Sequence, residues 1–173
     1  MARPSSNRNR PALDEDGLRA LALHYVGRYA TTRAKLAAYL TRKLRERGWA
    51  GTGAPPIEAL VQRIAGLGYV DDRAFAAARE QALARRGFGR RRRSQALSAA
   101  GIEPDDRAAV IDADEDPMES ALAFARRRRI GPFARAPMDE TARRRAFAAL
   151  MRAGHDPQTA SRILQSAPEE FPE

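Results

Sequence analysis

Residues 90–104 read RRRRSQALSAAGIEP, and residues 143–157 read RRRAFAALMRAGHDP. The two segments are identical at eight of 15 positions when they are aligned at an offset of 53 residues. The same offset carries residues 97–101 back to 44–48 and forward to 150–154, and each of these three segments begins with Leu and ends with Gly. Such a glycine is typical of a helix end, where it takes a left-handed conformation. Internal periods, usually of about 20–50 residues, indicate repeated helical units.

Alanine dominates the apolar part of this chain of 173 residues. Hydrophobic residues make up 43% of it but aromatic residues only 6%, and no stretch shows the alternation of a strand. Because alanine is the best helix former and strands prefer branched or aromatic residues, this composition favours packed helices over a sheet. We therefore predict an all-α fold of three tandem three-helix units that form an elongated helical-repeat array, either straight or curved. The predicted ranges are a flexible N-terminal tail at 1–16, three-helix units at 17–70, 71–115 and 116–167, and a C-terminal tail at 168–173.

Polar residues suited to helix N-caps precede several predicted helices. Thr31 or Thr32 is placed to cap the helix that follows it. Asp71 or Asp72 is placed to cap the first helix of the second unit, and Asp116 the first helix of the third. Their side-chain oxygens accept hydrogen bonds from N–H groups that the first turn of a helix leaves unpaired. The 71–72 pair could instead contact a partner, and capping is the interpretation we favour.

The chain carries a strong positive charge, formally +9, with a sequence pI near 11.0. Of its 31 basic residues 29 are arginines, which bind carboxylates and phosphates through paired hydrogen bonds. A field of this sign favours a polyanionic partner or an acidic protein surface. Abundant arginine together with abundant alanine is also what a GC-rich genome produces, so the composition leaves both interpretations open.

Arginines stand side by side in three clusters along the predicted helices. Consecutive helical residues point about 100° apart, so no run lies on a single face and part of each run stays solvated. A merely solvated helix face is therefore one interpretation of any single run. The runs at 90–92 and 143–145 occupy the same place in successive units, however, which favours a repeated basic stripe that contacts a repetitive anionic partner. The candidate partner-binding residues are Arg85, Arg86, Arg90, Arg91, Arg92, Arg93, Arg126, Arg127, Arg128, Arg129, Arg143, Arg144 and Arg145.

The sequence carries none of the common motifs that would indicate an enzyme. It lacks a phosphate-binding loop, a dinucleotide-binding glycine pattern, a zinc-binding H-E-x-x-H and a nucleophile elbow. It has no cysteine, which excludes disulfides and thiolate metal sites, and only two histidines. We expect no catalytic activity, no cofactor and no metal, and we interpret His155 as a packing residue. The acidic segment 112–116 is either a metal ligand set or a solvated linker, and the linker is favoured.

No segment of the sequence is suited to crossing or entering a membrane. No stretch reaches the roughly 18 apolar residues that a membrane-spanning helix needs. The basic N-terminus also lacks the apolar core of a secretory signal. We therefore expect a cytoplasmic protein. We also expect it to be a monomer.

Residues 67–106, which begin LGYVDDRAF, resemble the central module of the RecX family of regulatory proteins. The segments TTRAKLAAYLTRKLRERG and RRRRIGPF with RRRAFAALMRAGHD are similar to the family's first and C-terminal modules, so the resemblance covers about residues 18–166. Tyr69 is expected in the core, at the junction of the first two units. The residues that carry the central resemblance are Gly68, Tyr69, Val70, Asp71, Asp72, Phe75, Ala76, Arg79, Gly87, Gly89, Arg91, Leu97, Gly101 and Ile102.

This resemblance implies an all-helical, elongated protein of three modules without catalytic activity. It further implies binding to the RecA recombinase and to the helical filament that RecA forms on single-stranded DNA, with direct DNA contact as a further option. Members of the family generally restrain filament growth, ATP hydrolysis and strand exchange. They thereby modulate recombinational DNA repair and the SOS response.

A second hypothesis is a basic helical-repeat protein that binds nucleic acid independently of RecA. Such binding would fall steeply with salt, because each phosphate contact releases counterions. Few aromatic residues stand near the arginine runs to stack on bases, namely Phe88, Phe124 and Phe133. Comparing binding to a RecA filament with binding to bare DNA separates the two hypotheses.

Overall fold

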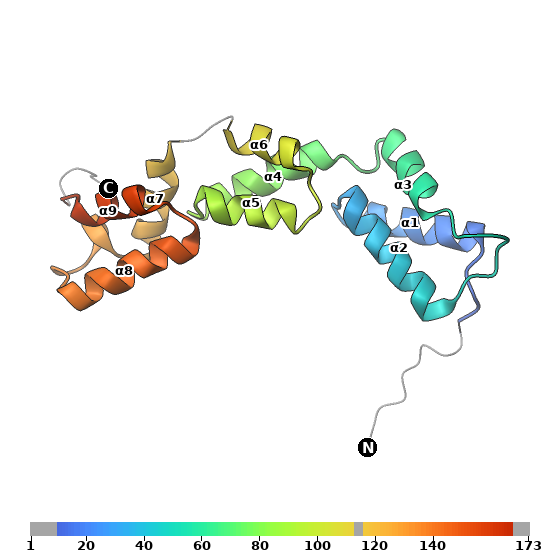
Figure 1. Cartoon of the computed structure of the whole chain (residues 1–173), viewed down its shortest axis with the longest axis horizontal. Coiled ribbons are helices and arrows are strands. Elements are labelled where there is room, and N and C mark those ends of the chain that lie inside the picture. Colours follow the sequence, from blue (N-terminus) through green and yellow to red (C-terminus); the bar gives the residue numbers. More distant parts are fainter. Residues whose placement is uncertain (1–9, 113–115, 168–173) are drawn as a thin grey trace, which may run out of the picture. The chain divides into compact units, whose positions relative to one another are not determined.

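A computed structural model of the chain describes residues 10–112 and 116–167. These residues form nine α-helices and one 3-10 helix, and the β-structure among them is an isolated parallel bridge between Leu13 and Trp49 (Figure 1). The predicted all-α fold is therefore confirmed. In the same residues, no helix has the length and apolar character needed to cross a membrane. The elements are α1 (Glu15–Arg28), α2 (Arg33–Arg47), α3 (Ile57–Gly66), α4 (Asp72–Ala84), α5 (Arg90–Ser98), α6 (Pro104–Asp112), α7 (Pro117–Arg128), η1 (Gly131–Phe133), α8 (Glu140–Ala153) and α9 (Pro157–Gln165).

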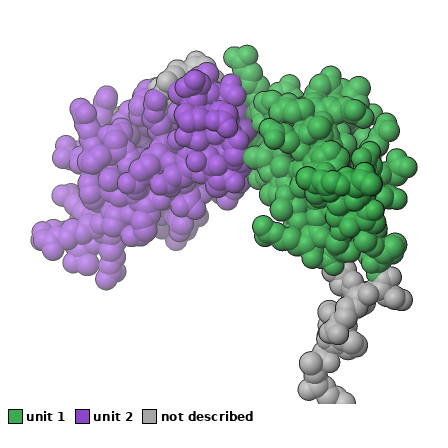
Figure 2. Space-filling model, turned by 45° about the vertical axis from the view of Figure 1, so that its right-hand side comes forward, with its two compact units in different colours: residues 1–75 green, residues 76–173 purple. Residues whose placement is uncertain are grey.

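The chain divides into two compact units, residues 1–75 and 76–173 (Figure 2). One apolar core is built from α1, α2 and α3 in the first unit, and another from α7, α8 and α9 in the second. The boundary at residue 75 falls inside α4, so this helix belongs to both units. The division into three three-helix units stays a prediction.

The first unit begins earlier in the chain than residue 17, the start predicted from the sequence. Leu13 is only 1% exposed and packs in the core of this unit. Its N–H donates to the Gly48 carbonyl oxygen at 3.0 Å, and its own carbonyl accepts from Ala50 N–H at 2.8 Å. Helix α1 begins at Glu15. Residues 10–16 thus belong to the first unit instead of the tail predicted at 1–16, and the rest of that tail lies outside the described residues.

Tyr69 was expected in the core, and this prediction is wrong. Its side chain is 57% exposed, and that of nearby Leu67 is 65% exposed. Gly68 turns the chain with a φ of 80°, and the next apolar residue, Val70, is buried at 6% exposure. Val70 therefore fills the core position that the motif suggested for the tyrosine.

The predicted N-caps are present in the structure. Thr32 Oγ1 accepts from Lys35 N–H at 3.2 Å, and Asp71 Oδ1 accepts from Ala74 N–H at 2.9 Å. Asp116 Oδ1 likewise accepts from Met118 N–H at 2.9 Å. Each bond satisfies a donor that the first turn of a helix leaves unpaired. Of the two alternatives at each earlier position, the structure thus selects Thr32 and Asp71.

The repeated leucine–glycine segments end helices as predicted, with closely matching geometry in two of the three copies. Gly101 and Gly154 have φ values of 78° and 94°. The following residue folds back in both: Ile102 N–H donates to the carbonyl oxygen at position 97, and His155 N–H to the one at position 150. Gly48 also has a positive φ of 83°, but its ψ of 170° sends the chain into the extended bridge with residue 13.

Two turns that lie far apart in sequence pack closely within the second unit. Gly89 N–H donates to the Ala153 carbonyl oxygen at 2.9 Å, and the ring Nε2 of His155 lies 3.0 Å from the Gly87 carbonyl oxygen. A Cβ added at Gly89 would lie 2.4 Å from the carbonyl carbon of Gly154, so only glycine fits. This contact holds the start of α5 against the end of α8, and it thereby positions Arg92 beside α8.

Candidate partner-binding groove

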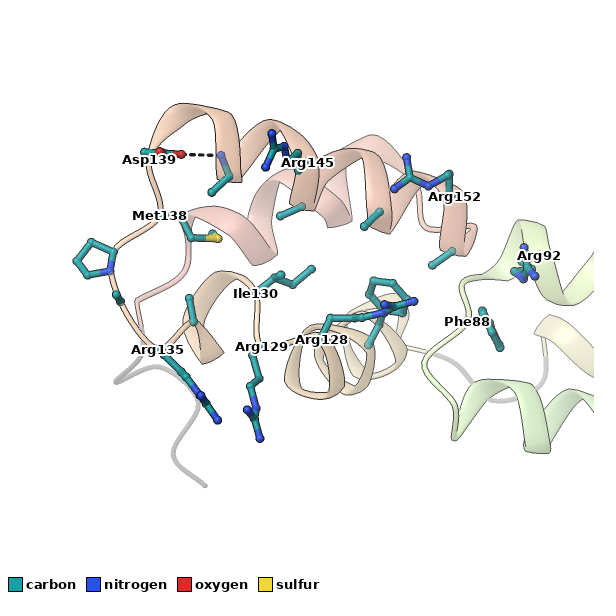
Figure 3. A pocket seen from close by; sticks show the side chains of 18 residues that line it. Phe88, Arg92, Arg128, Arg129, Ile130, Arg135, Met138, Asp139, Arg145 and Arg152 are labelled. Atoms are coloured by element: carbon teal, nitrogen blue, oxygen red, sulfur yellow. Dashed lines mark hydrogen bonds between the residues drawn. The ribbon is translucent and has the colours of Figure 1, made fainter.

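An open groove of about 970 Å³ runs between α7, the 130–139 segment and α8 in the second unit. The α4–α5 turn closes one end with Phe88, and the first turn of α5 adds Arg92 (Figure 3). Helix α7 ends at the groove, and the 3-10 helix η1 turns the chain back toward α8. We call this feature the α7–α8 groove.

Positive charge dominates the α7–α8 groove. Asp139 is the acidic side chain among its lining residues, and its Oδ1 accepts from Ala142 N–H at 2.7 Å as the N-cap of α8. One carboxylate against six arginines leaves the field of the groove strongly positive, and that carboxylate also stabilises the N-terminus of α8. Among the described residues, the arginines that line the groove are Arg92, Arg128, Arg129, Arg135, Arg145 and Arg152.

The floor of the groove is apolar. Helix α8 contributes Ala142, Ala146, Ala149 and Ala153, whose spacing of four, three and four residues puts them on one helix face. Ile130 lies opposite, between the two sides in Figure 3. Because alanine side chains are short, the backbone of another chain could approach α8 closely.

Arginines follow both sides of this floor. Arg145 and Arg152 are seven residues apart on α8, which places them about two turns, or roughly 10 Å, apart along its axis. Figure 3 shows them along α8 on one side, with Arg128, Arg129 and Arg135 on the other. The groove thus has an apolar floor with cationic rims, a pattern suited to an anionic ligand that also has an apolar face.

The predicted binding residues are distributed over several surfaces. Four of them, Arg92, Arg128, Arg129 and Arg145, come together in the α7–α8 groove. Positions 92 and 145 are equivalent in the repeat, and the fold brings both to the same site. The other exposed ones lie outside it: Arg85, Arg86, Arg90, Arg91, Arg126, Arg127, Arg143 and Arg144.

Some of the arginines outside the groove have local partners. Arg91 donates to the Met151 carbonyl oxygen at 2.8 Å, and Arg144 forms an exposed ion pair with Glu140 one turn earlier. A smaller hollow of about 640 Å³, lined by residues 90, 91 and 155 among others, adjoins the start of α9. These contacts within the chain give part of the basic runs a structural role that requires no binding partner.

Arg93 differs from every other predicted binding residue, because it is buried. Its side chain is 1% exposed, and its guanidinium donates to the carboxylate of Glu80 on α4. Burial lowers the pKa of Arg93, and the charge and hydrogen bond of Glu80 oppose that shift. We therefore remove Arg93 from the candidate surface and assign it to the interior. Ala146, the equivalent residue of the repeat, is also buried.

Sequence reasoning missed two residues of the groove, Arg135 and Arg152. Arg152 follows Arg145 by seven residues, so helical periodicity would have placed both on one side of α8. Arg135 stands alone in the segment after η1 and carries no such signal. Only the packing of this segment beside α7 brings it to the groove.

A second candidate surface lies in the first unit, where three tyrosines meet. The rings of Tyr25 and Tyr39 stack at a centroid distance of 4.1 Å and an interplanar angle of 15°. Tyr29 lies 5.3 Å from Tyr25 and is 51% exposed. Arg28 lies 5.9 Å from the centre of the Tyr29 ring, and Arg42 lies 5.6 Å from that of Tyr39. An exposed ring such as that of Tyr29 is suited to stacking with a base of single-stranded nucleic acid, and nearby cations are suited to contacting its phosphates.

His155 is a packing residue, as expected. It is 4% exposed, and burial lowers the pKa of its imidazole, while the bond with the Gly87 carbonyl oxygen partly opposes that shift. In the part of the chain that the structure describes, no group of three or more His, Asp or Glu residues is placed to hold a metal ion. Most of the acidic segment 112–116 lies outside the described residues, so its two interpretations stay open.

Three known proteins that are similar to this chain in sequence or in fold carry the same name. No protein-family model matches the sequence. The sequence is 33% identical to a curated protein named Regulatory protein RecX from Myxococcus xanthus, over 85% of this chain and 83% of the relative. It is 27% identical to a protein of the same name from Agrobacterium fabrum, over 86% and 82% of the two chains. The fold matches a crystal structure of regulatory protein RecX with a TM-score of 0.64 at 17% identity, over 88% of this chain and 74% of that one.

Proposed function

The chain belongs to the RecX family of regulatory proteins, and on that premise we propose that it binds the RecA recombinase and the RecA filament on single-stranded DNA. Bound there, it restrains filament growth, ATP hydrolysis and strand exchange. It thereby modulates recombinational DNA repair and the SOS response. Members of this family are regulatory proteins and not enzymes, so the proposal assigns binding and no catalysis.

The observation that carries the proposal is the α7–α8 groove. It gathers six arginines from α5, α7 and its C-cap, the 130–139 segment and α8 around one apolar floor. Arginine binds carboxylate and phosphate through paired hydrogen bonds, and a filament of protein on DNA presents both groups repeatedly. The groove is therefore the surface through which we expect the chain to contact the filament.

The test adds the full-length protein to RecA during filament assembly on single-stranded DNA. ATP hydrolysis, filament length and co-sedimentation are measured. We expect slower growth, shorter filaments and lower ATPase activity at amounts of protein well below those of RecA. If all three readouts are unchanged by the wild-type protein, the proposed function is wrong.

A pair of matched variants locates the surface. The groove variant carries Arg128→Ala and Arg145→Ala, and the matched control variant carries Arg127→Ala and Arg143→Ala. Both remove two exposed charges from α7 and α8, but only the first pair lines the groove. Because the loss of net charge is equal, general electrostatic attraction falls equally in both. We expect the groove variant to lose most of its effect on RecA and the matched control variant to keep it.

Direct contact with nucleic acid is a second, separate function that the tyrosines of the first unit favour. The half-exposed ring of Tyr29, beside the stacked pair, offers a face on which a base could stack. Binding of bare single-stranded DNA at several salt concentrations tests it, with Tyr29→Ala as the variant. Tight binding of bare DNA that does not increase with RecA would favour this function over regulation of the filament.

A further inference from the structure

We propose that the α7–α8 groove receives an amphipathic, acidic α-helix of a protein partner. The apolar stripe of this helix would lie on the floor of the groove, and carboxylates on its two flanks would bind the arginines of the two rims. The inference deepens the proposed function, because it rests on the same groove as the binding surface and names the chemistry of its occupant.

The floor of the groove selects for a protein segment with an apolar face. Ala142 and Ala149 are half-buried and present only methyl groups, and Ile130 and Met138 add larger apolar surface. Burying such a floor under the apolar stripe of a helix is favourable, because the apolar surface of both partners leaves water. The short alanines also allow the two helix axes to approach closely.

The aromatic rings of the groove are poorly placed to stack on nucleic-acid bases. Arg92 lies 4.9 Å from the centre of the Phe88 ring, and Arg128 lies 5.8 Å from that of Phe124. Phe124 is moreover only 8% exposed. Single-stranded nucleic acid is held by phosphate contacts together with stacking on exposed rings, and neither ring of the groove is exposed, since Phe88 is half-buried and Phe124 is buried. The observations thus favour an acidic protein segment over a nucleic-acid strand.

The rims match the geometry of a helix. Arg145 and Arg152 are two turns apart, so they suit carboxylates seven residues apart on one flank of a helix lying along α8. Arg128, Arg129 and Arg135 provide cations for the other flank (Figure 3). Asp139 is engaged as the N-cap of α8, which reduces its repulsion of incoming carboxylates.

Arg129 adds an independent observation. It follows the last residue of α7 with φ 54° and ψ 52°, and it is the non-glycine residue with positive φ in the described chain. Glycine adopts this conformation without strain, whereas a residue with a side chain does not. A strained arginine at the rim of a cationic groove points to a use for its charge at this place.

The experiment measures binding of three labelled probes to the full-length protein by fluorescence anisotropy near physiological salt. The first is a peptide of about 18 residues, roughly 27 Å long as a helix, with a stripe of Leu and Ala flanked on both sides by Glu. The second has the same composition, permuted so that no apolar stripe forms. The third is oligo(dT) with the same number of negative charges.

We expect the amphipathic peptide to bind at least about tenfold more tightly than the permuted peptide or oligo(dT), since only it uses both floor and rims. The groove variant should weaken its binding about tenfold, and the matched control variant less than about threefold. Arg129→Gly should weaken binding while its thermal midpoint does not fall below that of the wild type, because the substitution removes a charge and relaxes the backbone.

Several results would overturn the inference. Equal affinity for the two peptides would mean that the groove responds only to net charge. Tighter binding of oligo(dT) would identify a nucleic-acid site, and an equal loss in the matched control variant would place the peptide elsewhere. An Arg129→Gly variant that binds as the wild type does would remove this residue from the site.

Failure of this inference is distinguishable from failure of the proposed function, because the peptide assay contains no RecA. If the groove variant loses its effect on RecA filaments while the amphipathic peptide does not bind, the helical occupant is wrong and the proposed function stands. If the peptide binds as expected but the wild-type protein leaves RecA unaffected, the proposed function is wrong.

Discussion

Replacing Glu80 with alanine is expected to destabilise the second unit strongly, because it leaves the Arg93 guanidinium buried beside an empty space. The side chain of Arg93 is 1% exposed and that of Glu80 is 10% exposed. Removing one partner of a buried ion pair costs about 3–5 kcal/mol, since the remaining charge has lost its compensation. For a unit of this size each kcal/mol lowers the thermal midpoint by about 4–8 °C, so a loss of roughly 12 °C or more is expected.

A surface pair of the same unit serves as the control. Glu140 and Arg144 are paired one helical turn apart with side chains 79% and 77% exposed. Glu140→Ala should cost no more than about 0.5 kcal/mol, because exposed pairs at this spacing contribute little. A double substitution of Glu80→Leu with Arg93→Met should recover most of the stability, since apolar residues of similar volume often replace a buried pair without loss.

The assay is thermal and urea unfolding followed by circular dichroism, which reports the helices of both units. Trp49 is the single tryptophan of the chain and lies in the first unit, so its fluorescence reports that unit separately. The Glu80→Ala shift should appear in circular dichroism more strongly than in the fluorescence of Trp49. The reasoning is refuted if Glu80→Ala and Glu140→Ala unfold with the same midpoint.

Three further predictions concern packing inside the individual units. Gly89→Ala should lower the free energy of unfolding in urea by about 1–3 kcal/mol, because its Cβ would lie 2.4 Å from the carbonyl carbon of Gly154. Gly66 has open space around it in α3, so Gly66→Ala should instead raise that free energy by about 0.5–1 kcal/mol. Equal stabilities of the two variants would contradict the close approach at Gly89. Leu13→Ala should lower the stability reported by tryptophan fluorescence by about 2–5 kcal/mol, and an unchanged transition would mean that this residue is not part of the core. Burial lowers the pKa of His155 below its ordinary value near 6.5, so the unfolded chain takes up the proton first, and stability should fall as the pH drops below about 6.5. His155→Gln should therefore flatten the pH dependence of the urea midpoint between about pH 7.5 and 5. An equally steep profile in the variant would show that the burial of His155 is not the cause.

Helix ends were predictable from the sequence because they depend on local chemistry. Gly101 and Gly154 have the left-handed conformation that the repeated leucine–glycine segments predicted, and Asp116 caps the helix that follows it. Each of these features is determined by a few neighbouring residues. The repeat also placed Arg92 and Arg145 in equivalent positions, and both line the α7–α8 groove.

Arg93 was predictable from the repeat, but the run of four arginines hid the signal. It lies one helical turn before the buried Leu97, so both fall on the same helix face. The equivalent pair in the other copy is Ala146 and Leu150, and both are buried there too. Arg93 stands where the other copy has an alanine on the inward face, and this difference marked the inward-facing arginine. What the sequence did not reveal was the partner on α4 that makes its burial tolerable.

Features that depend on long-range contacts could not be predicted. Leu13 stands alone in a polar stretch, and its burial depends on backbone hydrogen bonds to residues near position 49. Arg135 reaches the groove only because η1 turns the chain beside α7. Tyr69 lies in a family-like motif, yet the turn at Gly68 directs the next residue, Val70, into the core instead.

Amide hydrogen exchange of the full-length chain, with and without RecA filaments on single-stranded DNA, tests the central claim most directly. Residues 134–139 line the α7–α8 groove and lie outside regular helices, so their amides should exchange quickly in the free protein. The account predicts that the filament slows exchange in this segment and in α8, and that the groove variant abolishes the slowing. Slowed exchange confined to the first unit, with this segment unchanged, would contradict it.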